Sequence, residues 1–152
     1  MSDSLIVRPV ARSDLARWER LWEGYNSFYH RTLAAEITRT TWSRFFDAYE
    51  PVHALVAQRG DRLVGLVHYL FHRSTITIGP TCYLQDLFTA EDARAQGVGR
   101  ALIEAVYSRA KEAGASRVYW LTRDTNLASI RLYDKLAETS GLVVYRMPIE
   151  PP

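Results

Sequence analysis

The sequence has one cysteine in 152 residues, no long hydrophobic run and no cluster of basic residues. The lone thiol, Cys82, cannot form an intramolecular disulfide, so we expect a reducing compartment, with the cytoplasm as the default. No stretch approaches the roughly 18 to 20 apolar residues that span a bilayer, and residues 1–5 lack the basic segment of an export signal. Neither membrane insertion nor export is expected.

Charge is also nearly balanced, because 19 basic and 17 acidic side chains are spread along the chain and give a net charge of +2. A protein that tracks a phosphate backbone usually gathers its basic residues, so a nucleic-acid partner is not expected. Hydrophobic residues make up 47% and charged residues 24%, as in ordinary globular proteins. The length suits one compact domain over residues 1–152.

Apolar periodicity and turn residues predict alternating strands and helices. Strands are expected at 4–9, 52–58, 63–71, 81–88, 117–122 and 142–147, and helices from Ser13 onward and at 41–49, 97–113 and 126–138. Ser13 is the expected N-cap of the first helix, Pro51 is expected to stop the second, and 117–122 reads as a strand buried on both faces. This order predicts an α/β (α+β layered) domain with a mixed, mostly antiparallel sheet flanked by helices.

A glycine-containing loop, residues 94–101, lies between a predicted strand and a predicted helix. Gly97 and Gly99 lack a Cβ, so the unpaired N–H groups of the first helical turn can approach an anion there. Arg94 and Arg100 add positive charge for a pyrophosphate or a 3'-phosphate. On its own the pair of glycines also fits a plain joint between loop and helix. A dinucleotide fingerprint is excluded because Leu102 stands where a third small residue is needed, and no G-K-S/T of a P-loop is present.

The motif R-x-x-G-x-G at a helix start, preceded by residues 84–89 and followed by Asn126 and Tyr133, resembles the GNAT superfamily of N-acetyltransferases. Within it, the sequence looks most like the branch of histone and polyamine acetyltransferases. The resemblance covers residues 84–133 closely. It implies acetyl-CoA as the co-substrate, with no metal.

The resemblance also implies a role for each matching residue. Leu87, Phe88 and Thr89 are expected to pair with the pantetheine arm as an added strand would. Asn126 is expected to bind near the thioester, and Tyr133 to protonate the departing thiolate. The pyrophosphate loop comprises Arg94, Ala95, Gln96, Gly97, Val98, Gly99, Arg100 and Ala101.

The general base is the least certain part of the site. Where polyamine-type enzymes have Leu-Glu-Asp, this chain has Gln85 before Asp86, and an amide cannot act as a base. Asp86 is the first candidate, as a base through water or as a holder of the substrate ammonium, and pairing with an arginine is an equally good account. His68 is a second candidate. His68 and His72 lie about 13 Å apart on an extended strand, too far for one metal ion.

These features predict an acetyl-CoA-dependent N-acetyltransferase whose acceptor is a primary amine, on a polyamine-like small molecule or a lysine side chain. A non-catalytic acyl-CoA-binding domain is the alternative, and transfer to a hydroxyl is a weaker one. Trp18, Trp22, Tyr25, Phe28 and Tyr29 either wall the acceptor site or pack in the core. Compared with the family pattern, four residues are inserted between Tyr133 and Gly141, which predicts a final helix one turn longer. A homodimer built by exchanging residues 142–147 therefore stays open.

Overall fold

The computed structural model describes residues 4–152, and the chain divides into two compact units, Met1–Leu121 and Thr122–Pro152. Each unit is described by itself. The single domain expected over 1–152 therefore stays a prediction. Residues 1–3, which were part of the argument against an export signal, lie outside the described residues.

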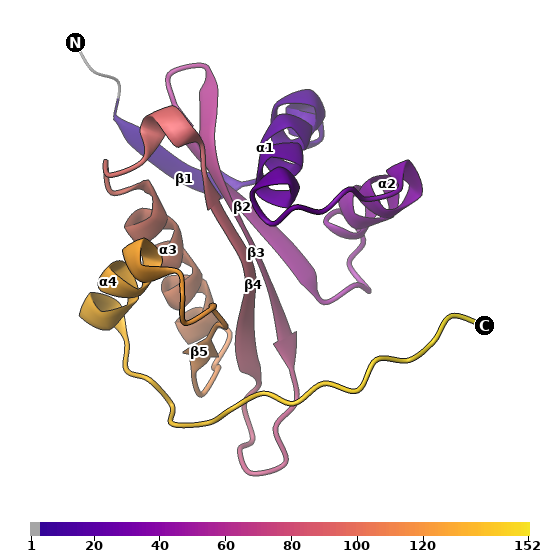
Figure 1. Ribbon diagram of the computed structural model, residues 1–152, viewed down its shortest axis with the longest axis vertical. Helices are drawn as coiled ribbons and strands as arrows, with labels where there is room; N and C mark the ends of the chain where they lie inside the picture. The colour runs from indigo at the N-terminus through magenta and orange to yellow at the C-terminus, as the bar shows by residue number, and fades with distance from the viewer. Residues whose placement is uncertain (1–3) are drawn as a thin grey trace. The chain divides into compact units, whose positions relative to one another are not determined.

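The first unit is built on a five-stranded sheet (Figure 1). Its strands lie in the order β1 (Leu5–Pro9), β2 (Val52–Arg59), β3 (Arg62–His72), β4 (Thr81–Thr89) and β5 (Val118–Tyr119). The first four pair antiparallel with their neighbours, whereas β4 and β5 run parallel. The expected mixed, mostly antiparallel sheet is confirmed.

Helices cover both faces of this sheet. Figure 1 shows α1 (Leu15–Phe28) and α2 (Ala35–Arg44) on one side and α3 (Val98–Glu112) on the other. The α1 face buries an aromatic core that includes Trp18, Trp22 and Leu66. On the α3 face the helix lies close to the sheet at Gly65, where an added Cβ would stand 2.8 Å from the Val98 side chain. The second unit contains α4 (Leu127–Leu136).

A β-bulge in β4 decides which face receives its polar side chains. Tyr69 of β3 pairs with Leu84, but His68 pairs with Asp86, so Gln85 is an extra residue in β4. Residues two apart on a regular strand share a face, and the extra residue breaks that alternation. Asp86 therefore faces α1 together with His68, while Leu84 shares the α3 face with Tyr69.

The first helix starts differently from the prediction. Ser13 is not its cap, since it lies inside a short 3₁₀ turn, Arg12–Asp14, and the helix begins at Leu15. The buried Asp14 carboxylate instead accepts the Ala11 N–H at 2.7 Å and ion pairs with Arg8 and Arg17 at 2.7 and 2.6 Å. Both arginines belong to the first unit. Because Arg8 lies in β1 and Arg17 in α1, their ion pairs with Asp14 connect the start of α1 to β1.

The predicted helix at 41–49 was misplaced. The observed α2 begins six residues earlier, at Ala35, and ends at Arg44, before Pro51 acts on it. Trp42, Phe45 and Phe46 nevertheless pack against the core as their spacing indicated. The periodic aromatic residues predicted the buried face correctly. Ile37 and Thr38 are weak helix formers, so the sequence pattern did not indicate where the helix starts.

Two predicted strands are shorter or absent. The strand expected at 117–122 is reduced to Val118–Tyr119, both half-buried, and Leu121 is exposed. Residues 142–147 form no strand in the described chain, and their apolar side chains are exposed: Leu142, Val143, Val144, Tyr145 and Met147. The composition of a segment sets its strand propensity, but a strand also requires the free edge of a neighbouring strand with which its backbone can pair. Helix α4 ends at Leu136, two residues before its predicted end.

Candidate active site

The free edge of β4 begins where β5 stops. Strand β5 pairs only with Cys82 and Tyr83, whereas Leu87, Phe88 and Thr89 pair with β3 on the other side. Within the described residues, no strand covers the second edge of β4 beyond Tyr83. The backbone groups of the predicted pantetheine segment therefore lie at an open edge, the arrangement that lets an extended ligand pair as a strand.

The loop after β4 leads into the N-terminus of α3. Gly97 is the cap residue and adopts a left-handed conformation with φ of 82°. The first helical hydrogen bond joins the Ala101 N–H to the Gly97 carbonyl at 3.0 Å. Val98 is buried against the sheet and anchors the turn. The N–H groups of Val98, Gly99 and Arg100 precede the first helical bond and lack helical partners, so the turn presents the donors that an anion needs.

A second left-handed residue precedes this turn. Ala95 has a φ of 62°, which is unusual for a residue with a Cβ and costs about 1 kcal/mol. Turns of this kind orient neighbouring N–H groups toward one side and form anion-binding concavities. An added Cβ at Gly97 would meet no atom within 4 Å, so the surface beside the turn is open. The residues present fit the pyrophosphate of coenzyme A.

The side chains of the loop have other partners in this structure. Arg94 lies over the rings of Phe28 and Phe88, at 5.4 and 5.8 Å from their centroids. Arg100 pairs with Glu104 one helical turn further on, at 2.9 Å. Gln96 accepts a hydrogen bond from Arg59 at 2.7 Å. The backbone of the loop is thus the part prepared for a phosphate.

The second unit carries the two remaining predicted residues. Asn126 is the cap residue of α4, and its carbonyl accepts the Ile130 N–H at 3.0 Å. Tyr133 is half-buried on the same helix, two turns further on. Their shared helix agrees with the spacing from which both were predicted.

The Asp86 carboxylate is the centre of a hydrogen-bond network on the α1 face. Its Oδ1 accepts the hydroxyl of Tyr25 at 2.9 Å, and its Oδ2 lies 3.0 Å from His68 Nδ1. The Asp86 side chain is 12% exposed. Among residues 4–152 no arginine or lysine forms an ion pair with it, so the predicted arginine partner for Asp86 is wrong. A cation from a ligand is the natural complement for such a carboxylate.

His68 supports Asp86 rather than competing with it. The indole N–H of Trp18 can only donate, and it lies 3.1 Å from His68 Nε2, so that nitrogen must be an acceptor. The proton of the imidazole is then on Nδ1, where it is donated to Asp86. His68 is 3% exposed and both of its nitrogens are engaged, which makes it a poor candidate for the base.

Tyr25 keeps its proton at every pH of interest. Burial, followed by the nearby Asp86 charge, raises the pKa of Tyr25 far above its usual value, although a hydrogen bond with Arg31 acts in the opposite direction. Tyr25 therefore serves as a fixed donor to Asp86. Trp22 and Tyr29 flank its ring, with centroids 5.5 and 5.1 Å away. The aromatic stripe of α1 both packs in the core and holds a carboxylate in position.

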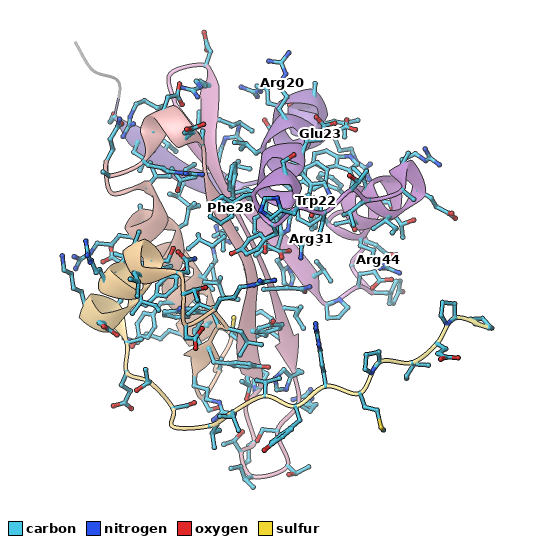
Figure 2. All side chains as sticks on the ribbon, viewed as in Figure 1. Arg20, Trp22, Glu23, Phe28, Arg31 and Arg44 are labelled. Atoms are coloured by element: carbon cyan, nitrogen blue, oxygen red, sulfur yellow. The ribbon has the colours of Figure 1, made fainter. Side chains whose placement is uncertain are left out.

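A groove of about 940 Å³ lies along α1, on the side of Gly24 and Ser27. Phe28, Phe88 and Arg94 line it, so it reaches the start of the pyrophosphate loop. The Phe88 ring also contacts Tyr25, with 6.1 Å between the centroids. Figure 2 shows Phe28 on α1, and Arg20, another lining residue, nearer its other end.

Sequence reasoning missed the partners of Asp86. Tyr25 and Trp18 were assigned to an apolar stripe, and nothing local in the sequence indicates that either hydrogen-bonds β3 or β4. A usable signal was present, because tyrosine and tryptophan on a buried helix face need partners for their polar atoms. Pairing them with Asp86 and His68 would have required the register of the sheet, including the bulge.

Comparison with known proteins defines the class as an N-acetyltransferase. The chain is 36% identical over 149 residues to the D-amino-acid N-acetyltransferase HPA3 of Saccharomyces cerevisiae, covering 96% of this chain and 92% of that protein. It is 28% identical over 101 residues to the thialysine N-epsilon-acetyltransferase of Caenorhabditis elegans, covering 63% and 62%. The structure of AAC(6')-Iy with the bisubstrate analog CoA-S-monomethyl-acetylneamine shares the fold, with a TM-score of 0.81, 17% identity, and 96% and 99% coverage.

The family model for the Acetyltransferase (GNAT) family matches residues 16–137. The chain belongs to this family and is an N-acetyltransferase. The alternative of a non-catalytic binding domain is thereby disfavoured. In the described part of the chain no group of three metal-ligating side chains occurs, and no helix there is long and apolar enough to cross a membrane.

Proposed function

We propose that this enzyme transfers the acetyl group of acetyl-CoA to the primary amino group of a small molecule, by direct attack within a ternary complex. The observation that carries this proposal is the Asp86 carboxylate, held by Tyr25 and His68 without a cationic partner among residues 4–152. A protonated amine is the ligand that such a group attracts. A small molecule is preferred over a lysine side chain because the relatives compared above are named for amino-acid substrates.

Asp86 has the capacity for two tasks. A primary amine is protonated at neutral pH, with a pKa near 10, and must lose a proton before it can attack a thioester. Each oxygen of a carboxylate has two lone pairs, and Asp86 uses one on each oxygen for its protein partners. The remaining lone pairs face the ligand, where they hold the ammonium and accept its proton, directly or through water.

Acetyl-CoA supplies the thioester when it is bound. We assign its pantetheine to the open edge formed by Leu87, Phe88 and Thr89, and its pyrophosphate to the backbone of residues 95–101. We assign the stabilisation of the oxyanion to N–H groups of the same β4 edge, and the donation of a proton to the departing thiolate to Tyr133. Asn126 is assigned to the thioester end. No covalent enzyme intermediate is required.

The assay is thiol release from acetyl-CoA across a panel of amines. Turnover of at least one small amine is expected. Tyr133→Phe is expected to lower kcat by about 10- to 100-fold while the Kd for acetyl-CoA changes by less than about twofold, because the hydroxyl acts in the transition state. An equal loss of turnover and cofactor affinity contradicts the acid role. Coenzyme A binding without turnover on any amine contradicts the proposed function.

Other expectations belong with this proposal. The amino-acid relative makes both D- and L-amino acids part of the panel, beside polyamines. Assignment to the polyamine branch, residence in the cytoplasm, a homodimer, and the lack of nucleic-acid or membrane partners stay predictions. Burial raises the pKa of the Cys82 thiol to about 11, which keeps this cysteine unreactive.

A further inference from the structure

Arg31 packs against the ring of Tyr25, the residue whose hydroxyl contacts Asp86. Arg31 follows α1 and is visible just beyond the end of that helix in Figure 2. Its guanidinium carbon lies 5.3 Å from the ring centroid of Tyr25 and 5.2 Å from that of Tyr29. The hydroxyl of the same Tyr25 side chain donates to Asp86. A cation and an anion thus both contact one tyrosine.

The guanidinium is held in place but is not neutralised. Arg31 Nε donates to Asn26 Oδ1 at 3.2 Å, and its backbone N–H donates to the Asn26 carbonyl at 2.8 Å. Asn26 is itself buried and fixed by a hydrogen bond to the Trp22 carbonyl at 2.9 Å. Within the described chain, no carboxylate forms an ion pair with Arg31. Neither terminal nitrogen of the guanidinium pairs with a carboxylate in that part of the chain, so the guanidinium can bind the carboxylate of a ligand.

A zwitterion matches this pair of charges. In an α-amino acid the nitrogen and the carboxyl carbon are about 2.5 Å apart, which follows from the N–Cα and Cα–C bond lengths. Charge-assisted hydrogen bonds of about 2.8 Å at each end would let such a ligand bind one group that contacts the Tyr25 hydroxyl and another that contacts the Tyr25 ring. The amino group then lies at the carboxylate that receives its proton. A fork-shaped guanidinium is suited to a carboxylate.

We propose that Arg31 is a specificity residue that binds the carboxylate of the acceptor, so that the site selects α-amino acids. This inference rests on the proposed function and names its substrate class. The same cation disfavours a polyamine, because a second ammonium close to the first would meet the positive charge of Arg31. Arg31 gives a lysine side chain no added affinity, because the lysine Nε is far from any carboxylate of its own residue.

The test compares acceptors that differ only at the carboxylate: both enantiomers of alanine, alaninamide, ethylamine and 1,3-diaminopropane. The native enzyme is expected to favour one enantiomer of alanine over its amide by about 10- to 100-fold in kcat/KM. In Arg31→Met that ratio is expected to fall toward one, through a higher KM for alanine. Arg31→Lys is expected to restore part of the ratio, because it returns the charge without the fork.

Arg39→Met is the matched control, since Arg39 is an exposed arginine on α2 with no ion pair in the described chain. It removes the same charge and should leave the ratio as in the native enzyme. Thermal unfolding of each variant checks that the fold is kept. Equal rates on alanine and alaninamide in the native enzyme, or an unchanged ratio in Arg31→Met, overturn the role of Arg31 and leave the proposed function standing. Failure to acetylate any amine overturns the proposed function itself.

Discussion

The two halves of the candidate site are built in different ways. The turn at the start of α3, to which we assign the pyrophosphate, is made of consecutive backbone groups, and its Arg100 side chain pairs with Glu104 further along the helix. The acceptor side is made of side chains that come from α1, β3 and β4 and meet only in the fold, around Asp86. The first half can be recognised from a short motif, whereas the second depends on helix packing and sheet register.

This difference predicts that the two halves fail separately when they are mutated. A change on the acceptor side should affect turnover and acceptor binding, and a change in the backbone turn should affect the cofactor alone. The variants below test that separation, from the largest expected effect to the smallest.

Asp86→Asn should have the largest effect. The amide keeps the shape of the carboxylate but loses the charge that holds an ammonium and accepts its proton, so kcat/KM for the acceptor should fall by about 1,000-fold. The Kd for coenzyme A, measured by calorimetry, should stay near the native value. A loss of less than tenfold would show that Asp86 is not the base, and a parallel loss of coenzyme A binding would contradict the separation of the two halves.

Asp14→Asn tests whether α1 can be weakened without touching the chemistry. The hydrogen bond and charge of Arg8, with the Ala11 N–H and Arg17, hold the pKa of Asp14 at about 2, below its unfolded value near 3.9. A lowered folded pKa contributes stability above the unfolded pKa and loses it as the pH falls through about 2. The contribution at neutral pH is about 2 kcal/mol.

Urea unfolding at pH 7 should therefore show Asp14→Asn to be less stable by about that amount, with the gap to the native protein closing toward pH 2. Turnover of the folded variant should remain native at temperatures well below its transition. A gap that stays constant from pH 7 to pH 2 would mean that the charge of Asp14 is not what stabilises the entry to α1.

Gly97→Ala should have the smallest effect and should act on the cofactor alone. An added Cβ meets no atom, but the left-handed backbone at φ of 82° costs about 1 kcal/mol for alanine. The Kd for coenzyme A should rise by about fivefold, and the KM for the acceptor should stay unchanged.

Gly114→Ala is the control for that experiment. Gly114 lies at the other end of α3 with a φ of 75° and equally open space, so alanine there carries the same strain away from the turn. It should lower the thermal midpoint as Gly97→Ala does, without changing the Kd for coenzyme A. Equal effects of the two variants on that Kd would indicate general destabilisation of α3.

The sequence was sufficient to predict most of the architecture around the cofactor. Strands β2, β3 and β4 and helix α3 were located to within one residue, because alternating or helical apolar spacing is strong there and glycines mark the turns. The predictions failed where neighbours decide the structure. The C-terminal segment at 142–147 has strand composition and no paired strand, and α2 starts among residues with weak helix propensity.

The candidate site shows the same difference between features that a local sequence pattern predicts and features that depend on the fold. Residues 94–101 could be assigned because a phosphate needs only a backbone turn. Asp86 could be proposed from its position beside Gln85, but its role could not be judged until Tyr25 and His68 were seen to hold both of its oxygens. Pairing with an arginine was one of the two accounts of Asp86 that the sequence left open, and the structure gives it Tyr25 and His68 as partners instead.

The bulge at Gln85 makes the face on which Asp86 lies depend on how the strand is paired at one position rather than on the type of residue there. Gln85 is exposed and has no partner in the ladder between β3 and β4, so many side chains fit at this position. If Gln85 were paired as a regular residue of the strand, Asp86 would share the α3 face with Leu84 and would point away from Tyr25. Because Gln85 bulges out of the ladder, Leu84 and Asp86 instead occupy opposite faces, as two adjacent residues would. The irregular pairing at one exposed position therefore decides which face of the sheet carries the carboxylate.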